Sequence, residues 1–508
     1  MEKYIRINKI DNVIVALEDI NPGDCVLIDD KTIVAKDLIP AGHKMAVTSL
    51  SKGAKVIKYG QPIGAVKEDT AEGSHIHIHN LVTLLSESKE YSYEPLPLES
   101  KENSYEPMIS GASSSISKKR DTFMGYERAD GRVGVRNEIW IISTVGCVAK
   151  VAEKIASMAN RHLHDGIDEV VALTHPYGCS QMGEDQENTR KVLANLIKHP
   201  NAGGVLVLGL GCENSNIEVL KPYLGDYDKE RIRFLVAQEC EDEILKGVDI
   251  VDELMMLASS DVRKPVSLSK LVVGLKCGGS DGFSGITANP CVGVFSDLLI
   301  NNGGTTILTE VPEMFGAETL LMNRCENKEI FDKTVNLIND FKDYFTSHGQ
   351  TVYENPSPGN KKGGISTLED KSLGCTQKSG STPVKGVLKY AEPVSHEGLN
   401  LLSAPGNDLV AATALAASGA QIVLFTTGRG TPFSCPVPTV KISSNSTLFE
   451  GKRNWIDFNA GEVVEGSNVE AVGGRLFDFV MEVAEGKKVK SELAGFHDMA
   501  IFKQGVTL

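Results

Sequence analysis

The sequence predicts an α/β protein that begins with a small all-β domain, and three observations along the chain support this. Short strand-like runs separated by turn residues fill the first part, and a stretch rich in Ser, Glu and Pro follows. From Asp121 onward, strand-like and helix-like runs alternate, which is typical of βαβ units with a parallel sheet. We therefore expect a β domain at residues 1–95, a linker at 96–120, a Rossmann-like α/β domain at 121–262 and a second α/β unit at 263–508.

The amino-terminal part has the residue pattern of a small, closed β domain. Turn signals such as Asn21-Pro22-Gly23-Asp24 and Pro40-Ala41-Gly42 interrupt it at short intervals, and no long amphipathic helix fits between them. The strand-like runs are residues 4–8, 13–17, 25–28, 32–34, 44–47 and 55–59. The domain ends in His75-Ile-His-Ile-His79, where the period of two in a strand places His75, His77 and His79 on one face.

The linker and the α/β units follow from equally local patterns. Residues 91–119 have too little apolar content to pack by themselves, which predicts a solvated linker. Residues 355–385 show no clear period, and structureless stretches of that length are usually functional. The expected strands are 138–145, 169–175, 204–210, 232–237, 271–275, 305–311, 399–404, 422–426 and 439–443, and the expected helices are 148–163, 185–198, 215–224, 241–258 and 318–347.

Composition narrows the class of protein and of partner. The chain has 508 residues and a net charge of −15, which disfavours nucleic acid and anionic membranes as partners but allows a small anionic molecule. The start of the chain does not resemble a signal peptide and no run reaches transmembrane length, so we expect a cytoplasmic protein whose cysteines are mostly reduced. The Walker A and Gly-x-Ser-x-Gly motifs are missing, which disfavours nucleotide binding and a serine hydrolase.

Four thiols stand at the ends of strand-like runs. Cys147, Cys179 and Cys212 each follow a glycine, and Cys277 opens Cys-Gly-Gly-Ser-Asp-Gly. Loops after the carboxyl ends of parallel strands gather at one edge, so these thiols are expected to meet at one rim. Together with the histidine run, they indicate a metal site or a reactive centre, although each cysteine could also be a small buried residue. His43 has weaker support, because a surface turn explains it equally well.

Further polar groups cluster in glycine-rich segments. The loop after Cys277 carries Asp281 and groups suited to binding hydroxyls, and Arg429 lies between glycines after a strand, where it could hold a carboxylate. Lys441 lies within an apolar strand, and Glu310 and Glu313 close another, so each is a candidate acid, base or ligand. The candidate substrate-binding residues are Ser280, Ser284, Thr287, Asn289 and Thr431.

Several of these motifs resemble those of the altronate/galactarate dehydratase family, almost from end to end. They include Pro176-Tyr-Gly-Cys-Ser-Gln, Gly209-Leu-Gly-Cys-Glu-Asn, Cys277-Gly-Gly-Ser-Asp-Gly-Phe-Ser-Gly-Ile-Thr-Ala-Asn-Pro, Leu373-Gly-Cys-Thr-Gln-Lys, Thr427-Gly-Arg-Gly-Thr-Pro and Trp455-Ile-Asp-Phe-Asn-Ala-Gly. The amino-terminal domain resembles the β-clip module, called SAF, that precedes the catalytic part in this family. The histidine run resembles the altronate branch, whereas Phe433-Ser-Cys-Pro departs from the usual glycine-containing turn.

The resemblance implies an enzyme that removes water from a sugar acid with a divalent metal, usually iron(II). For the altronate branch it implies conversion of D-altronate to 2-dehydro-3-deoxy-D-gluconate. We assign Arg429 to the substrate carboxylate and treat Lys441, Glu310 and Asp281 as the other candidate catalytic groups. The metal candidates are His75, His77, His79, Cys147, Cys179, Cys212 and Cys277.

Several alternatives remain open at this point. The metal could be manganese(II), or the four strand-end thiols could hold an iron–sulfur cluster. The substrate could be another sugar acid such as galactarate, or the reaction could be that of a related sulfo-lyase. The chain could also be a sugar-acid-binding protein without catalysis, and it could form a homo-oligomer.

Overall fold

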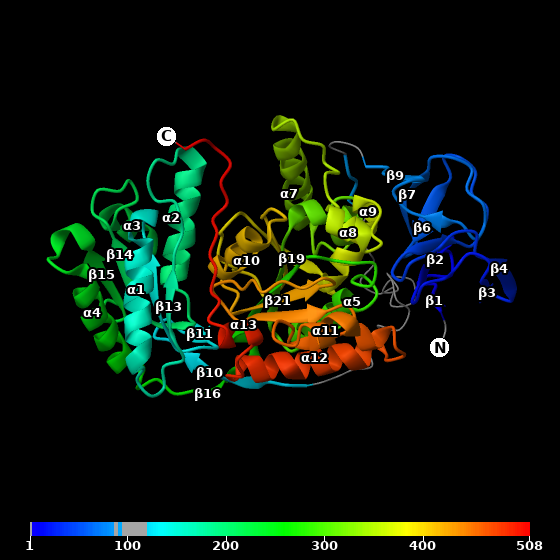
Figure 1. Cartoon of the computed structure of the whole chain (residues 1–508). Coiled ribbons are helices and arrows are strands. Elements are labelled where there is room, and N and C mark those ends of the chain that lie inside the picture. Colours follow the sequence, from blue (N-terminus) through cyan, green and yellow to red (C-terminus); the bar gives the residue numbers. More distant parts are fainter. Residues whose placement is uncertain (1–2, 86–89, 94–118, 508) are drawn as a thin grey trace.

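The computed structural model describes residues 3–85, 90–93 and 119–507, so the predicted linker at 96–120 lies almost wholly outside the described residues. Three units lie side by side (Figure 1). A four-stranded parallel sheet with its helices lies at one end, a seven-stranded parallel sheet lies in the middle, and the amino-terminal strands lie at the other end. Among the described residues, no helix is both long and apolar enough to span a lipid bilayer.

The amino-terminal unit is built from short antiparallel strands, which confirms the predicted all-β domain. Its sheets have the orders β1-β2-β5-β8, β3-β4 and β6-β7-β9. The strands are β1 (Tyr4–Ile5), β2 (Val13–Ala16), β3 (Cys25–Ile28), β4 (Lys31–Val34), β5 (Lys44–Ala46), β6 (Lys55–Lys58), β7 (Gln61–Val66), β8 (His75–Ile76) and β9 (Leu81–Val82). Strand β8 ends at Ile76, so the expected strand alternation does not continue through His79.

The four-stranded parallel sheet has the order β13-β12-β14-β15. Its strands are β12 (Glu138–Ser143), β13 (Val170–Leu173), β14 (Ala202–Gly209) and β15 (Ile232–Val236), and its helices are α1 (Ala149–Ala159), α2 (Gly183–Ile197), α3 (Ile217–Leu224) and α4 (Glu243–Ala258). Because side chains alternate along β12, Ile139 and Ile141 pack with α1 and α4, whereas Trp140 and Ile142 pack with α2 and α3. The apolar run of β12 is thus explained by helices on both faces.

The seven-stranded sheet is parallel throughout and has the order β19-β20-β18-β17-β21-β22-β23. Its strands are β17 (Val272–Cys277), β18 (Thr305–Leu308), β19 (Val384–Leu388), β20 (Gly398–Leu402), β21 (Ile422–Thr427), β22 (Thr439–Ser443) and β23 (Phe458–Asn459). Its helices are α5 (Ala288–Asn301), α6 (Glu318–Met322), α7 (Lys328–Ser347), α8 (Pro358–Lys362), α9 (Leu368–Cys375), α10 (Asp408–Ala417), α11 (Ser446–Gly451), α12 (Val469–Ala484) and α13 (Lys490–Leu493). The segment at 355–385 therefore contains α8 and α9, which are too short to show a clear period in the sequence.

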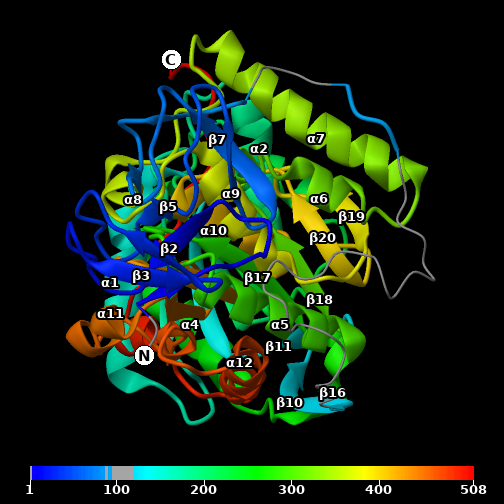
Figure 2. The same cartoon turned by 90° about the vertical axis from the view of Figure 1, so that its right-hand side faces the viewer.

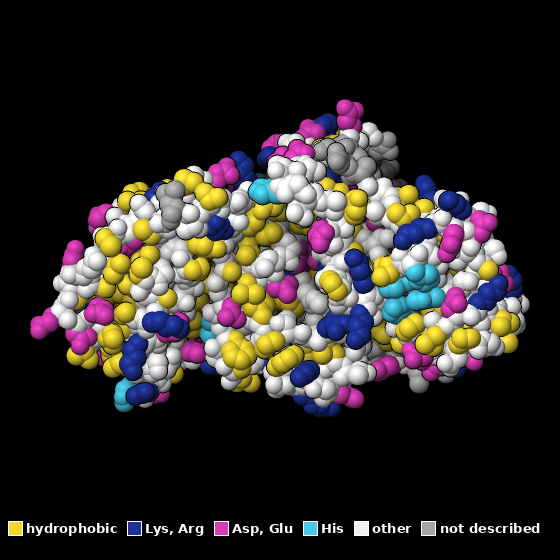
Figure 3. Space-filling view, turned by 45° about the horizontal axis from the view of Figure 1, so that its top comes forward, with side chains coloured by type: hydrophobic (Ala, Val, Ile, Leu, Met, Phe, Trp, Pro, Cys, Tyr) yellow, Lys and Arg dark blue, Asp and Glu magenta, His cyan; other side chains and the backbone are white. Residues whose placement is uncertain are grey.

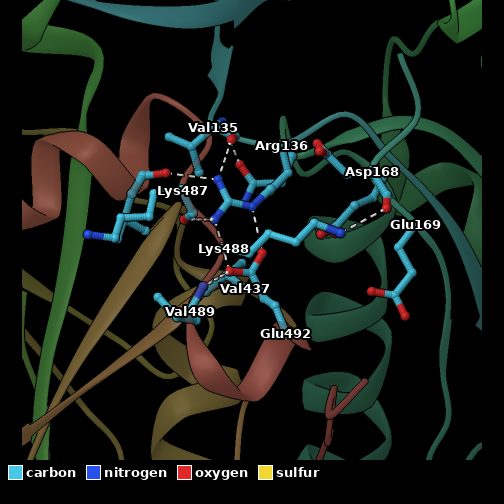
Figure 4. A network of polar contacts seen from close by, with 12 residues as sticks. Val135, Arg136, Asp168, Glu169, Val437, Lys487, Lys488, Val489 and Glu492 are labelled. Carbon is cyan, nitrogen blue, oxygen red and sulfur yellow. Dashed lines mark hydrogen bonds and ion pairs between the residues drawn. The ribbon is translucent and has the colours of Figure 1, made fainter. Parts of the chain in front are cut away.

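A small antiparallel sheet and a buried ion pair join the two parallel units. The small sheet consists of β10 (Thr122–Glu127), β11 (Val133–Gly134) and β16 (Lys264–Ser267). Beside it, the buried Arg136 guanidinium donates to both carboxylate oxygens of Glu492 at 2.6 and 2.9 Å and to the Lys487 carbonyl at 2.9 Å (Figure 4). This bidentate pair fixes the start of β12 against α13.

The amino-terminal domain docks on loops at the carboxyl edge of the seven-stranded sheet, in front of which it lies in Figure 2. A Cβ atom added at Gly282 would lie 2.0 Å from the carbonyl oxygen of Gly42, and one at Gly364 would lie 2.2 Å from the same atom. Only glycine allows backbones from three distant segments to approach this closely. Ile286 and Leu373 also belong to the apolar core of the amino-terminal domain, so the two units share one core.

Candidate active site

Three histidines meet where the amino-terminal domain touches the seven-stranded unit. His43 directly precedes β5 and His75 begins β8, and these two strands pair. The Nδ1 atom of His43 lies 3.0 Å from Nε2 of His75, and the His77 ring lies 4.8 Å from the His43 ring between centroids. One ligand atom from each of the three residues lies within 4.8 Å of the other two. His79 contacts only the outer side of this cluster, at 5.3 Å from the His75 ring, and is exposed.

The last residue of α8 and the loop that follows it each contact one nitrogen of a histidine ring in this cluster. Nδ1 of His77 lies 2.9 Å from Ser366 Oγ, and Nε2 of His43 lies 3.3 Å from the carbonyl oxygen of Lys362. Such contacts orient metal-binding histidines and fix their tautomer. Burial and neighbouring positive charge lower the pKa of His75 to about 4 and that of His77 to about 3. Both rings are therefore neutral at pH 7, the state that binds a metal.

A buried carboxylate anchors this region to helix α9. Asp370 accepts hydrogen bonds from Nζ of Lys44 at 2.8 Å and from Nζ of Lys58 at 3.0 Å. All three side chains are almost completely inaccessible to solvent. Burial alone would raise the pKa of Asp370, but the two ammonium groups hold it well below its usual range. The amino-terminal domain thus contributes two buried lysines, and the Asp370 carboxylate of the other unit neutralises their charge.

A second cluster surrounds Cys277, at the carboxyl end of β17. Its Sγ donates to Glu313 at 2.9 Å, lies 3.4 Å from Sγ of Cys375, and accepts from Nζ of Lys378 at 3.1 Å. Nζ of Lys371 lies 2.6 Å from Glu313. The hydrogen bond with Cys375 is the largest influence and lowers the pKa of Cys277 to about 6, with the ammonium groups acting in the same direction. Burial alone would raise the pKa of Glu313, but Lys371 and Lys378 lower it to about 2.

Glu310 lies behind this cluster and supports it. Its carboxylate accepts from the backbone N–H of Cys277 at 2.8 Å and from Nζ of Lys276 at 3.1 Å, and Lys276 also donates to Asp408 at 2.7 Å. Burial and the nearby Glu313 raise the pKa of Glu310. Its backbone is left-handed, with φ of 69°, a conformation that costs energy outside glycine and is frequent at functional sites. The predicted role of Glu310 as an acid or ligand therefore stays a hypothesis, since its oxygens already bond the protein.

Cys277, Glu313 and Lys371 line a cavity of about 530 Å³, large enough for a sugar acid. A much smaller cavity, of about 10 Å³, lies beside it between Lys58, Ser280 and Cys375. The hydroxyl of Ser280 is buried and has no hydrogen-bond partner among the described residues. A buried hydroxyl without a partner is costly, so Ser280 is available for a ligand.

The other predicted binding residues of the glycine-rich loop bond the protein itself. The Asp281 carboxylate accepts from Ser284 Oγ at 2.8 Å, Ser444 Oγ at 2.8 Å and Asn445 Nδ2 at 3.1 Å. Thr287 Oγ1 donates to the Ser444 carbonyl at 2.8 Å, and Asn289 bonds Thr426 at 2.6 Å. These side chains hold the loop in shape, and this use of their polar atoms was not visible in the sequence.

Arg429, Thr431 and Lys441 occupy different surroundings. The Arg429 guanidinium is exposed and reaches the Gly359 carbonyl at 3.3 Å, and Gly279 lies against its stem, so it borders the cavity. Thr431 Oγ1 accepts from the backbone of Phe433 at 3.3 Å. Nζ of Lys441 donates to the Pro432 carbonyl at 2.9 Å, and burial lowers its pKa to about 8. Lys441 does not line the cavity of Cys277, which weakens its prediction as the base.

The expectation that four thiols meet at one rim is wrong for Cys277. Cys147, Cys179 and Cys212 follow strands of the four-stranded sheet and are exposed, whereas Cys277 belongs to the other sheet and is buried. The mistake arose because strand-end position is local information, whereas the division of strands between two sheets is not. The residues that sequence reasoning missed or underweighted are His43, Lys44, Lys58, Asp370, Lys371, Cys375 and Lys378. For Cys375 and Lys378, the family motif at 373–378 was the available signal.

Three successive segments of the chain match profiles of one protein family. Residues 2–84 match the profile described as "Altronate/galactarate dehydratase SAF domain", residues 125–259 match "D-galactarate dehydratase/Altronate hydrolase, second domain", and residues 268–507 match "D-galactarate/Altronate dehydratase, C-terminal". A β domain followed by two parallel α/β units is thus the architecture of one known class of lyases. The chain belongs to the altronate/galactarate dehydratase family.

Individual relatives agree with this assignment over at least 96% of their length. The chain is 53% identical to altronate dehydratase of Bacillus subtilis (strain 168) over 511 residues and 50% identical to altronate dehydratase of Escherichia coli (strain K12) over 508, with 100% of both chains covered in each case. It is 33% identical to galactarate dehydratase (L-threo-forming) of Escherichia coli (strain K12), covering 98% of this chain and 96% of the relative.

Proposed function

We propose that this protein is a hydro-lyase that dehydrates D-altronate to 2-dehydro-3-deoxy-D-gluconate. The observation that carries the proposal is the identity of 50% and 53% with two altronate dehydratases along the entire chain. The cavity beside Cys277 supports it, because cationic and thiol groups meet there at the end of parallel strands. A buried thiol whose pKa is lowered to about 6 is typical of a reactive site, which favours catalysis over binding alone.

We place the metal at the histidine cluster, with iron(II) as the proposed ion and manganese(II) as the alternative. His43, His75 and His77 fit this role because their nitrogens converge and two rings are oriented from behind. The group of Cys277, Glu313 and Cys375 fits less well, because Lys371 and Lys378 already supply its positive charge. A divalent metal held by these histidines would supply Lewis-acid chemistry, which stabilises the negative charge that develops during elimination.

We assign the proton transfers to residues of the cavity. Elimination breaks the C2–H bond, whose electron pair forms the C2–C3 double bond while the C3–O bond breaks. The sulfur of Cys277 is the proposed acceptor of the C2 proton, because Cys375 and the nearby ammonium groups lower its pKa to about 6. The Lys371 ammonium donates a proton to the departing hydroxyl, which leaves as water. The enol product then tautomerises to the 2-keto acid.

Two further residues position the substrate in this proposal. Arg429 holds the carboxylate in a charge-assisted hydrogen bond, since its guanidinium is exposed at the border of the cavity. The unpartnered hydroxyl of Ser280 bonds a water molecule in the smaller cavity next to Lys371, and that water bonds a substrate hydroxyl. Asp281 acts indirectly, because its carboxylate holds the loop that carries Ser280.

An anaerobic assay tests the function. The protein is supplied with iron(II) or manganese(II) and offered a panel of hexonates and hexarates, and formation of the 2-keto-3-deoxy acid is followed. Turnover of D-altronate above all other acids is the expected result. Turnover of galactarate without turnover of altronate would move the substrate assignment to the branch of the 33% identical relative.

A further inference from the structure

Three Gly-Cys turns at the carboxyl edge of the four-stranded sheet have no role in the proposed reaction. Cys147 follows β12, Cys179 follows β13 and Cys212 follows β14, so neighbouring strands of one sheet deliver all three. All three thiols are exposed. Reduced thiols at an open protein edge react readily with oxidants, so three of them side by side call for a function.

The three turns are locked together by their backbones. The N–H of Gly146 donates to the Tyr177 carbonyl at 2.9 Å, and the N–H of Ser215 donates to the Gly178 carbonyl at 3.0 Å. A Cβ atom added at Gly178 would lie 2.0 Å from the Thr144 carbonyl oxygen, and φ of Gly178 is +99°. The glycine before Cys179 is thus required for close approach of two turns. The cysteines are therefore held in fixed positions on one small edge.

Helix ends and polar side chains surround this edge. Helices α1 and α2 begin beside it, and the first backbone N–H groups of a helix have no partner within the helix. The Arg190 guanidinium donates to the Asn214 carbonyl at 3.2 Å, while Asn214 Oδ1 accepts from Cys179 Sγ at 3.2 Å. Gln238 donates to Cys212 Sγ at 3.6 Å. Cys179 and Cys212 thus each have a side-chain amide within hydrogen-bonding distance of the sulfur.

We propose that Cys147, Cys179 and Cys212 are the ligands of an iron–sulfur cluster, which goes beyond the proposed dehydration and uses a separate site. Ligand sulfurs of a single tetrahedral ion lie about 2.3 Å from it, and so at most about 4.6 Å from one another. Among the described residues, the groups of three donors within 4.8 Å of one another do not include these thiols. A cluster of several irons spreads its cysteine ligands farther apart and is held by thiolates, so it fits this edge better.

A fourth strand-end cysteine supplies the matched control. Cys240 follows β15 of the same sheet, but its Sγ donates to the Val236 carbonyl at 3.4 Å. Its thiol therefore bonds the end of its own strand. Cys25 is an exposed thiol in the amino-terminal domain. Cys375 reports on the alternative in which Cys277 and its neighbour bind the cluster instead.

Anaerobic incubation of the full chain with equal amounts of ferrous and ferric iron and with sulfide tests the proposal. After removal of excess reagents, wild type should hold acid-labile sulfide and absorb broadly in the visible range. C147S, C179S and C212S should each lose most of both signals, whereas C240S, C25S and C375S should keep them. A wild-type protein without bound sulfide, or a signal that survives all three substitutions, would overturn the proposal, and loss in C375S would move the cluster to Cys277.

A second measurement needs no variant, which covers the case of a substitution that prevents folding. Iodoacetamide treatment followed by mass spectrometry should label Cys147, Cys179 and Cys212 in the metal-free protein and spare them after reconstitution. Equal labelling in both states would contradict the proposal. The dehydration assay with iron(II) alone is run on the same wild-type preparation, so failure of the proposed function is seen separately.

Discussion

The two parallel sheets carry cysteines at equivalent strand ends, yet these cysteines differ in exposure and in the side chains around them. At the edge of the four-stranded sheet, Cys147, Cys179 and Cys212 are exposed beside neutral amides. At the edge of the seven-stranded sheet, Cys277 is 1% exposed among lysines and glutamates. In Figure 3 a patch of histidines lies on the surface close to basic side chains, and the histidine cluster belongs to the domain that covers the second edge.

The difference teaches that the second edge is covered, and that the covering domain is anchored to the same helix that carries part of the cavity. Docking of the amino-terminal domain brings Lys44 and Lys58 to Asp370 on α9, and the same helix presents Lys371 and Cys375 to Cys277. Helix α9 thus has one set of charges facing the docked domain and another facing the cavity. The open edge lacks such a cover among the described residues and keeps its thiols available to an external group.

The largest effect is expected from removing the Asp370 charge, which holds the amino-terminal domain over the second edge. In D370N, Lys44 and Lys58 stay buried without a counter-charge, and breaking a buried ion pair costs about 3–5 kcal/mol. We expect that loss in the free energy of unfolding, measured with denaturant. E153Q, which breaks the exposed pair with Lys150, should change it by about 1 kcal/mol or less. Equal effects of the two substitutions would show that the cover is not held by its buried charges.

A smaller effect is expected from Arg429, which borders the covered cavity without being buried. Its hydrogen bond to a charged group is worth about 1.5–3 kcal/mol, so R429A should raise KM for altronate about 10- to 100-fold. The folded protein should be as stable as wild type. R453A offers a control, since Arg453 is exposed and stacks on Phe449. Unchanged kinetics of R429A would remove this residue from the site.

The seven-stranded unit also orients a histidine of the covering domain, and S366A tests how much this contact contributes to metal binding. Ser366 Oγ lies 2.9 Å from Nδ1 of His77, and loss of such a contact weakens metal binding about 10- to 100-fold. Binding of manganese(II), followed by electron paramagnetic resonance, measures the affinity without turnover. S347A, on the exposed end of α7, should leave it unchanged. If S366A binds the metal as wild type does, the histidine cluster does not hold the ion as proposed.

The last and smallest expected effect is a shift in the pH midpoint for alkylation of Cys277. Because the pKa of Cys277 is lowered to about 6, the thiolate is present above pH 6 and is lost as pH falls through that value. Site-resolved alkylation of Cys277 should therefore rise with pH and level off near neutral pH. A midpoint near 8.5, the ordinary value for cysteine, would show that Cys375 and the lysines do not stabilise the thiolate.

Several features could be predicted from the sequence because they depend on neighbouring residues. Turn signals predicted the amino-terminal strands, alternation predicted the parallel sheets, and the motifs predicted the family. The domain boundaries, the Rossmann-like character of the two units and the roles of the site residues stay predictions. The histidine run was found, but its geometry was not, because the chain turns at His77 and brings in His43 instead of His79.

The sequence by itself determined where strands end, which thiols follow them and which motifs the chain shares with its relatives. Only the tertiary structure decided that Cys277 is separated from the other three thiols, that His43 joins His75 and His77, and that Asp370 and Lys378 balance buried charge. The physical reason is the separation along the sequence between the residues that interact. Turns and periodicity arise between residues close in sequence, whereas burial and charge pairing arise between segments such as 43–58 and 366–378, which meet only when one domain docks on another.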